Sequence, residues 1–294
     1  MAALLGVFWL DDWLDTLRLE GWWSEVFFGR TYLPSGLALF AAAACVLPFA
    51  SWELTRIFRA NHIDASPWIT TIAAELGLML NYAVSKDMEA VTSAAIISTG
   101  LVGMFVASLW YFSRGKNVDG VVAAAGGAMF AMIYLGLMAG FYLTLRRWES
   151  AWLILAVILT TKSCDIGAYF TGRAFGRTKL IEWLSPKKTW EGLMGGVATA
   201  ALVGVGFALL GRQVQDVEIQ DGLVHHYVFP LWFAALAGML FAIVGQIGDL
   251  TASLLKRDAG LKDSSRMIPG FGGVLDVLDS PLLVAPVAYW MFSL

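Results

Sequence analysis

A succession of long apolar segments limits what this chain can fold into. A membrane-spanning helix needs roughly 20 mostly apolar residues, because its backbone polar groups must be hydrogen-bonded within the segment. Eight segments approach or meet this length: 34–55, 67–84, 89–112, 119–145, 150–172, 192–211, 229–252 and 274–293. The second is the weakest, since Glu75 and Asn81 interrupt it. Only 15% of the residues are charged, against about 25% in soluble domains. We therefore expect an all-α, polytopic integral membrane protein.

The first 32 residues have a different character from the spans. Trp9, Trp13, Trp22 and Trp23 stand among acidic and basic residues, which is typical of an amphipathic helix lying in the membrane interface. A first, short crossing is the alternative, and it would raise the number of spans from eight to nine. We expect three parts: an N-terminal lead over 1–32, a transmembrane bundle over 33–148 and a C-terminal transmembrane region over 149–294 that carries the motifs described below.

The distribution of lysine and arginine predicts the orientation of the spans. If the connections after the first, third, fifth and seventh spans share one side, that side holds 13 of the 20 basic residues, and the other side holds six. Cytoplasmic connections are enriched in these residues, so the first side is predicted to be cytoplasmic in a plasma (inner) membrane. The pair Arg146-Arg147 argues against this orientation.

A polar stripe marks the end of the seventh span. Gln246, Asp249, Ser253 and Lys256 are spaced by three, four and three residues, which places them on one face of a helix. An ionisable residue within a span is costly and indicates function by default. The structural alternative is a Lys256 that extends its amine to the interface and an Asp249 that only ends the helix.

Two further carboxylates stand at the start of the eighth span. Asp276 and Asp279 share a helix face and follow the glycine-rich stretch 269–273. Glycines let the backbone approach a ligand closely and leave N–H groups free. The two carboxylates could simply interact with the helix dipole. Together with Asp249, however, they would repel unless a cation lay between them, and oxygen ligands without Cys or His favour Mg²⁺.

The fifth span and the connection after it supply the positive charge. Asp165 lies within the span and Lys162 just before it, while Lys187, Lys188 and Thr189 precede a predicted helix whose N-terminus favours anions. Two lysines, a hydroxyl group and a helix N-terminus suit a triphosphate or a phospholipid head group. Ordinary cytoplasmic charge and binding to anionic lipid surfaces are the alternatives.

In this order the motifs resemble those of the CDP-diacylglycerol synthases, also called phosphatidate cytidylyltransferases. The family pattern is similar to Ser-x-x-Lys-Arg, Lys-Asp and Pro-Gly-His-Gly-Gly followed by Asp-Arg-x-Asp. Here it stands as Ser253 to Arg257, Lys262-Asp263 and Pro269 to Asp279. The segments around Asp165, Ser185 to Gly192 and Gly248-Asp249 also resemble the family, so the resemblance covers residues 165–280. Phe271 and Val277 stand where the family often has His and Arg, and no role of those residues is carried over.

The resemblance implies that CTP and phosphatidate react to CDP-diacylglycerol and pyrophosphate in phospholipid biosynthesis, at the cytoplasmic face of the membrane. It implies catalytic roles for Asp249, Asp276, Lys256 and Asp263, and Mg²⁺ held by Asp249, Asp276 and Asp279. Substrate binding is expected from Ser185, Lys187, Lys188, Thr189, Ser253, Arg257, Lys262, Asp165, Gly272 and Gly273. The expected partners are the two substrates and membrane lipids, with no nucleic acid. A homodimer and a second, monovalent cation stay open.

Three other functions compete with this interpretation. A CTP-dependent polyprenol or phytol kinase would share the membrane site and Mg²⁺, but it would transfer the terminal phosphoryl group to an alcohol and so need a base. A transporter would place its charges near the middle of the membrane, whereas these lie at one face. A non-catalytic lipid-binding scaffold would not require three carboxylates beside several lysines and arginines.

Overall fold

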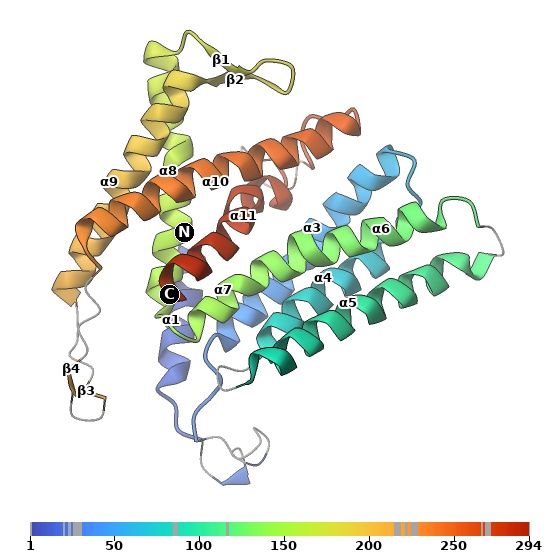
Figure 1. Ribbon diagram of the computed structural model, residues 1–294, viewed down its shortest axis with the longest axis horizontal. Coiled ribbons are helices and arrows are strands. Elements are labelled where there is room, and N and C mark those ends of the chain that lie inside the picture. The colour runs from blue at the N-terminus through green and yellow to red at the C-terminus, as the bar shows by residue number, and fades with distance from the viewer. Residues whose placement is uncertain are drawn as a thin grey trace.

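The computed structural model describes residues 2–19, 21–22, 25, 31–84, 88–115, 118–214, 219–220, 223–224, 229–265, 267 and 272–293, and these form a mostly helical protein (Figure 1). The helices of the first half are α1 (Ala2–Asp15), α3 (Leu37–Ala60), α4 (Pro67–Ala83), α5 (Ala90–Phe112), the short η1 (Ser113–Gly115), α6 (Val121–Ala131), η2 (Met132–Leu137) and α7 (Met138–Arg146). The second half contains α8 (Ala151–Phe175), α9 (Trp190–Val214), α10 (Leu231–Asp258) and α11 (Val274–Ser293). Two small antiparallel hairpins join β1 (Lys179–Ile181) to β2 (Ser185–Thr189) and β3 (Ile219–Gln220) to β4 (Leu223–Val224).

The expected all-α membrane architecture is confirmed. Among the described residues, seven helical segments are long and apolar enough to cross a membrane. One of them is the continuous run α6–η2–α7, in which η2 is a π-helical turn. Each of the eight expected spans corresponds to a helix, but α4 has only 17 residues and is not among the seven. Helix α1 has 14 residues, fewer than the roughly 20 that a crossing needs.

The last helix connects the two halves of the chain. Helix α11 packs against α3 and α7 from the first half and against α8 and α10 from the second. Its buried Leu275 and Leu282 belong to one apolar core with Leu47 and Leu54 of α3. The positions of residues in the second half therefore depend on the first.

Arg146, which argued against the predicted orientation, is buried in an ion-pair network. Its Nε donates to Asp11 Oδ2 at 2.7 Å, and its Nη2 contacts Asp15. Asp11 in turn accepts hydrogen bonds from the backbone N–H groups of Ala38 and Leu39 at the start of α3. The charge of Arg146 is thus neutralised inside the protein and ties α1 to α3 and α7, so this arginine serves packing and not the balance of loop charges.

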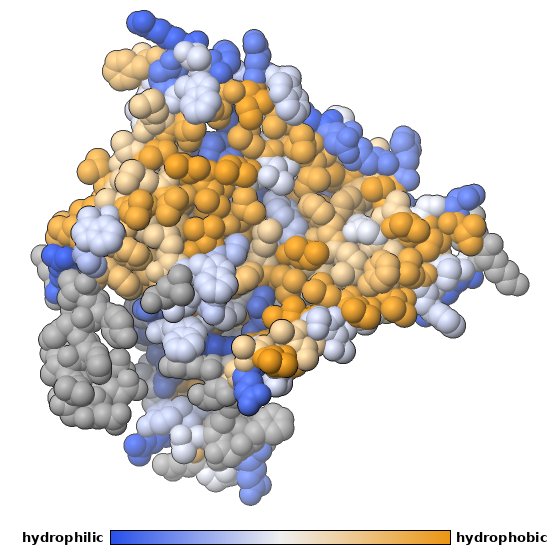
Figure 2. All heavy atoms as spheres, viewed as in Figure 1, coloured by the Kyte–Doolittle hydropathy of each residue, from blue (hydrophilic) through white to orange (hydrophobic). Residues whose placement is uncertain are grey.

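The connections alternate between two sides of the molecule. In Figure 1 the links α3–α4, α5–α6, α8–α9 and α10–α11 lie toward the top and right, and the links α4–α5, α7–α8 and α9–α10 lie toward the lower left. A hydrogen bond from Asn61 to Asp258 joins the ends of α3 and α10 on the first side. Figure 2 shows apolar side chains over the middle of the visible face and hydrophilic ones at its upper and lower margins, as expected for a membrane protein.

Candidate active site

The polar stripe of α10 lies along one face of the helix, as its spacing predicted, and the structure turns that face to the protein interior. Gln246 and Lys256 are buried and Asp249 and Ser253 are half-buried, while Leu254 on the opposite side is 47% exposed. Helix α11 lies close to this face, because a side chain at Gly248 would lie 2.5 Å from the backbone oxygen of Asp279. The missing side chain thus allows the two acid-bearing helices to touch.

Lys256 forms a buried ion pair with Asp276. Its Nζ lies 2.5 Å from Asp276 Oδ1, and the two side chains are 9% and 11% exposed. The other oxygen, Oδ2, accepts hydrogen bonds from the N–H and hydroxyl groups of Ser264, at 3.2 and 2.9 Å, and from the N–H of Gly273 at 2.9 Å. Asp276 therefore stands at the start of α11, as predicted, with both oxygens engaged by the protein.

A second ion pair joins Lys188 to Asp249. Lys188 lies in β2, whose pairing with β1 converts the expected loop into a hairpin, and its Nζ contacts Asp249 Oδ2. Helix α9 begins at Trp190, which confirms the predicted helix after Thr189. The Thr189 hydroxyl accepts a hydrogen bond from Gly192 N–H at 3.1 Å and is buried, so it caps this helix. The hairpin and the cap together fix where Lys188 meets α10.

Lys162 lies between two further carboxylates. Its Nζ is 3.8 Å from Asp165 Oδ2, one turn along α8, and 3.7 Å from Asp279 Oδ1 of α11. Asp279 is only 2% exposed and also accepts hydrogen bonds from the N–H and hydroxyl groups of Ser280. Asp249 is near enough to Asp279 for their negative charges to oppose each other. The site therefore joins α8, β2, α10 and α11 through three lysines and four aspartates.

Each carboxylate has a lysine partner, and this bears on metal binding. Among the residues that the structure describes, no three His, Cys, Asp or Glu side chains are grouped to hold a metal ion. The carboxylate oxygens are nevertheless the ligands that Mg²⁺ prefers, and Mg²⁺ is commonly held by only one or two carboxylates together with substrate phosphates. The negative charges of Asp249 and Asp279 repel each other, and a cation between them would relieve that repulsion.

The remaining predicted site residues are distributed around these pairs. Lys187, Arg257, Lys262 and Asp263 are exposed, and Ser185 is half-buried at the start of β2. The expectation that the glycine-rich stretch leaves N–H groups free is wrong at Gly273, whose N–H donates to Asp276. Residues 269–271 of that stretch lie outside the described part of the chain.

Two residues near the site were not predicted. Glu53 of α3 is buried and accepts hydrogen bonds from Ser264, Ser265 and the start of α11. Tyr134, in the π-helical turn η2, is buried with a hydroxyl that has no hydrogen-bond partner among the described residues. Its hydroxyl is within electrostatic reach of Asp249, Asp276 and Asp279. Glu53 could have been found from the sequence, because it is an acidic residue inside an apolar segment. No sequence pattern distinguishes Tyr134.

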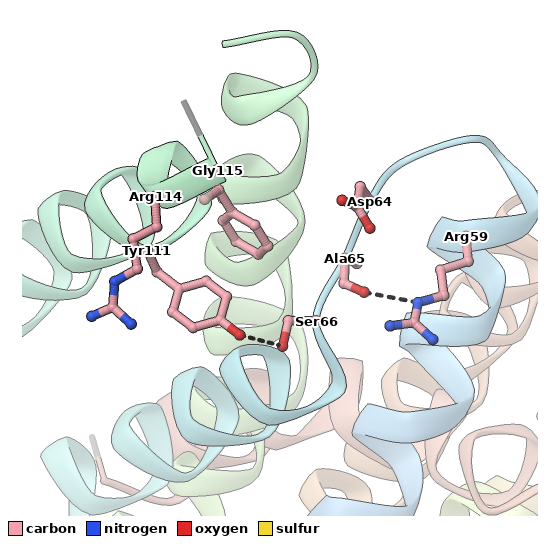
Figure 3. Close-up of a pocket in the computed structure, with 8 residues that line it drawn as sticks. Arg59, Asp64, Ala65, Ser66, Tyr111, Arg114 and Gly115 are labelled. Carbon is pink, nitrogen blue, oxygen red and sulfur yellow. Dashed lines mark hydrogen bonds between the residues drawn. The ribbon is translucent and has the colours of Figure 1, made fainter. Parts of the chain in front are cut away.

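A recess of about 490 Å³ lies elsewhere, between the α3–α4 link and the end of α5 (Figure 3). It is lined by residues that include Arg59, Ser66, Tyr111 and Arg114. Arg59 donates to the backbone oxygen of Ala65, and the Arg114 guanidinium lies over the ring of Tyr111. None of the three lysines and four aspartates of the candidate site lines this recess.

Comparison with known proteins identifies the family. A model of the Cytidylyltransferase family matches residues 19–294. The chain belongs to this family. It is 37% identical over 288 residues to a phosphatidate cytidylyltransferase of Synechocystis sp., a match that covers 86% of this chain and 88% of that protein. It is 32% identical over 255 residues to the Brucella suis protein of the same name, covering 86% and 83%. A 39% identical match to the one from Pseudomonas aeruginosa spans 144 residues and about half of each chain.

Membership of the Cytidylyltransferase family makes this chain a nucleotidyltransferase. The family match begins at residue 19, so it includes the first half of the chain, where the sequence motifs are absent. The paired lysines and aspartates suit such an enzyme, because nucleotidyl transfer needs positive charge for phosphates and carboxylates for a cation.

Proposed function

We propose that this enzyme transfers the cytidylyl group of CTP to phosphatidate, giving CDP-diacylglycerol and pyrophosphate. The observation that carries the proposal is the meeting of Lys162, Lys188 and Lys256 with aspartates at one place in the fold. The names of the relatives that match most of the chain supply the substrates.

The reaction needs position and charge more than it needs a base. A phosphate oxygen of phosphatidate forms a bond to the α-phosphorus of CTP, and the bond from that phosphorus to the bridging oxygen of the β-phosphate breaks. Pyrophosphate leaves with the electron pair. Because phosphatidate is already an anion, no strong base is required, and the site must align two anions and neutralise them. The three lysines, now held by aspartates, provide that charge when a polyphosphate competes for them.

Mg²⁺ is the proposed cofactor, and it would neutralise the departing pyrophosphate. The carboxylates proposed to hold it are Asp249, Asp276 and Asp279. The contacts differ among them: the negative charges of Asp249 and Asp279 repel each other, whereas Asp276 has both oxygens occupied by Lys256, Ser264 and Gly273. We therefore assign the metal chiefly to Asp249 and Asp279, and we assign to Asp276 the placement of Lys256.

Further substrate contacts are proposed from residues around the pairs. The exposed side chains of Lys187, Arg257 and Lys262 are accessible to phosphates, and Ser253 lies on the inward stripe of α10. Five more residues keep the roles that the family resemblance implies, which are catalysis for Asp263 and substrate binding for Ser185, Asp165, Gly272 and Gly273. We assign Thr189 the role of capping α9. The excess of basic residues in the connections on this side supports a cytoplasmic active site in the plasma membrane.

The test is a transfer assay with purified protein in detergent, phosphatidate, Mg²⁺ and CTP labelled at the α-phosphate. We expect label in the lipid fraction and none after EDTA is added. Asp249→Asn should lower the rate at least about 100-fold, while Asp258→Asn, a carboxylate at the end of the same helix outside the pairs, should retain it. Label entering an alcohol lipid from γ-labelled CTP, with none from the α-label, would replace the proposal with the lipid kinase.

A further inference from the structure

Glu53 is a buried carboxylate in the first apolar helix, far in sequence from every motif. It lies in α3 and is 4% exposed. A charged group in such a place is costly unless donors surround it. Four donors do so: Ser264 Oγ at 2.9 Å, Ser265 Oγ at 2.5 Å, Val274 N at 2.9 Å and Leu275 N at 2.8 Å. All four come from the segment that joins α10 to α11 or from the start of α11.

Two of these bonds cap α11 from another helix. The first N–H groups of a helix have no partner within it, and a carboxylate at that end interacts favourably with the helix dipole. Val274 and Leu275 are the first two residues of α11, and Glu53 accepts from both of their N–H groups. The residue that fixes the start of α11 is thus separated from it by more than 200 residues of chain.

The glycine before α11 leaves room for this carboxylate. A side chain at Gly273 would place its Cβ 2.6 Å from the carboxyl carbon of Glu53 and in overlap with the Ser264 hydroxyl. Any larger residue would therefore displace one of them. The absence of a side chain at position 273 is explained by the docking of Glu53.

The same contacts reach the ion pair of the proposed site. Ser264 Oγ lies 2.9 Å from Glu53 Oε2 and 2.9 Å from Asp276 Oδ2. The Ser264 hydroxyl has one hydrogen, so it donates to one of the two carboxylates at a time, while the Ser264 backbone N–H donates to Asp276 throughout. Asp276 holds Lys256 at 2.5 Å. A continuous set of contacts therefore runs from Glu53 through Ser264 and Asp276 to Lys256.

We infer that Glu53 is a positioning residue for the active site: it docks Ser264, Ser265 and the start of α11 onto α3 and thereby fixes Asp276 and Lys256. The inference rests on the proposed function for its catalytic consequence. It assigns the first half of the chain a direct part in placing the reacting groups, although Glu53 does not itself touch the substrates.

The test compares Glu53→Gln with a matched control, Glu75→Gln, a half-buried glutamate of α4 that makes none of these contacts. Glutamine keeps the size of Glu53 but turns one acceptor into a donor, which cannot accept the hydrogen bond of a backbone N–H at the start of α11. The first readout is the rate of hydrogen exchange in peptides that contain Val274 and Leu275, measured by mass spectrometry. The second is the turnover rate at saturating CTP and phosphatidate, divided by the folded fraction.

We expect Glu53→Gln to speed exchange at the start of α11 at least about tenfold, with exchange in α4 unchanged, and to lower turnover by about the same factor. Glu75→Gln should change neither. Because Glu53 acts through Ser264, adding Ser264→Ala to Glu53→Gln should lower turnover by less than the product of the two single effects. Ser265→Ala, which removes one of the four bonds, should give a smaller change of the same kind.

Unchanged exchange at Val274 and Leu275 together with turnover within twofold of the wild type would overturn the inference. A general rise of exchange that includes α4 would also overturn it, since it would indicate a role in overall stability only. Wild-type protein without cytidylyl transfer would instead refute the proposed function, and the exchange measurement would still decide whether Glu53 docks α11.

Discussion

Replacing both members of the Lys256–Asp276 pair separates its structural role from its catalytic one. The pair is buried, with side chains 9% and 11% exposed and 2.5 Å between Nζ and Oδ1. Removing one partner of a buried pair costs roughly 3–5 kcal/mol, because the other charge stays buried and unpaired. Lys256→Met leaves Asp276 with its hydrogen bonds from Ser264 and Gly273, so we expect the lower end of this range. Asp276→Asn leaves the lysine without a carboxylate, so we expect the upper end.

The double variant is the informative one. If the two substitutions acted independently, their stability losses would add in the double variant. Because the double variant contains no unpaired charge, we expect it to lose no more stability than either single variant. Turnover should be lost in all three proteins, because Lys256 is proposed to neutralise substrate phosphate. Thermal unfolding in detergent, followed by tryptophan fluorescence, measures stability, and the labelled-CTP assay measures turnover. Arg56→Met, at an exposed position of α3, is the control and should stay within about 0.5 kcal/mol of the wild type.

Two results would refute this reasoning. A double variant whose stability loss equals the sum of the single losses would show that the two charges are not coupled. A double variant that regains both stability and turnover would show that the pair serves packing alone and that the proposed role of Lys256 is wrong.

Three further substitutions test separate features. Gly273→Ala should lower both Tm and turnover, since its Cβ would lie 2.6 Å from the Glu53 carboxyl carbon; an unchanged Tm would contradict the packing. Tyr134→Phe removes a hydroxyl without a described partner, so Tm should not fall, while turnover should drop if that hydroxyl serves a ligand; full turnover would exclude such a role. Burial raises the pKa of Glu149 from 4.5 to about 7. Between these two pH values the folded protein binds more protons than the unfolded chain, so the free energy of unfolding falls as the pH rises from 4.5 to about 7. Glu149→Gln should therefore raise Tm relative to wild type at pH 8 but not at pH 4, and equal Tm differences at the two values would contradict the shift.

The features predicted correctly are those that follow from local periodicity. Runs of apolar residues predict helices because the bilayer allows few other structures, and all eight expected segments are helical. The spacing of Gln246, Asp249, Ser253 and Lys256 predicted one helix face, and these residues lie on the inward side of α10. Only the geometry of a single helix is needed for such a prediction.

The features that the sequence did not reveal depend on which helices meet. Lys188 and Asp249 are 61 residues apart, and Glu53 is more than 200 residues from its donors. No local pattern gives these pairings, since they follow from the packing of α3, α9, α10 and α11. The N–H groups of Val274 and Leu275 likewise find their acceptor in a distant helix, whereas the Gly273 N–H, expected to be free, donates to the nearby Asp276.

The division of labour between the two halves of the chain follows from these contacts. The family motifs occupy residues 165–280, yet α11 is held by Glu53 through hydrogen bonds and by Leu47 and Leu54 through apolar packing, all of them in α3. Without α3, the first N–H groups of α11 would lose their acceptor, and the apolar core that contains Leu275 would lose Leu47 and Leu54. Unsatisfied polar groups and exposed apolar surface both oppose folding. We therefore expect the motif-bearing half to depend on the half that carries no motif, because Glu53 helps to fix the start of α11 and, with it, Asp276 against Lys256.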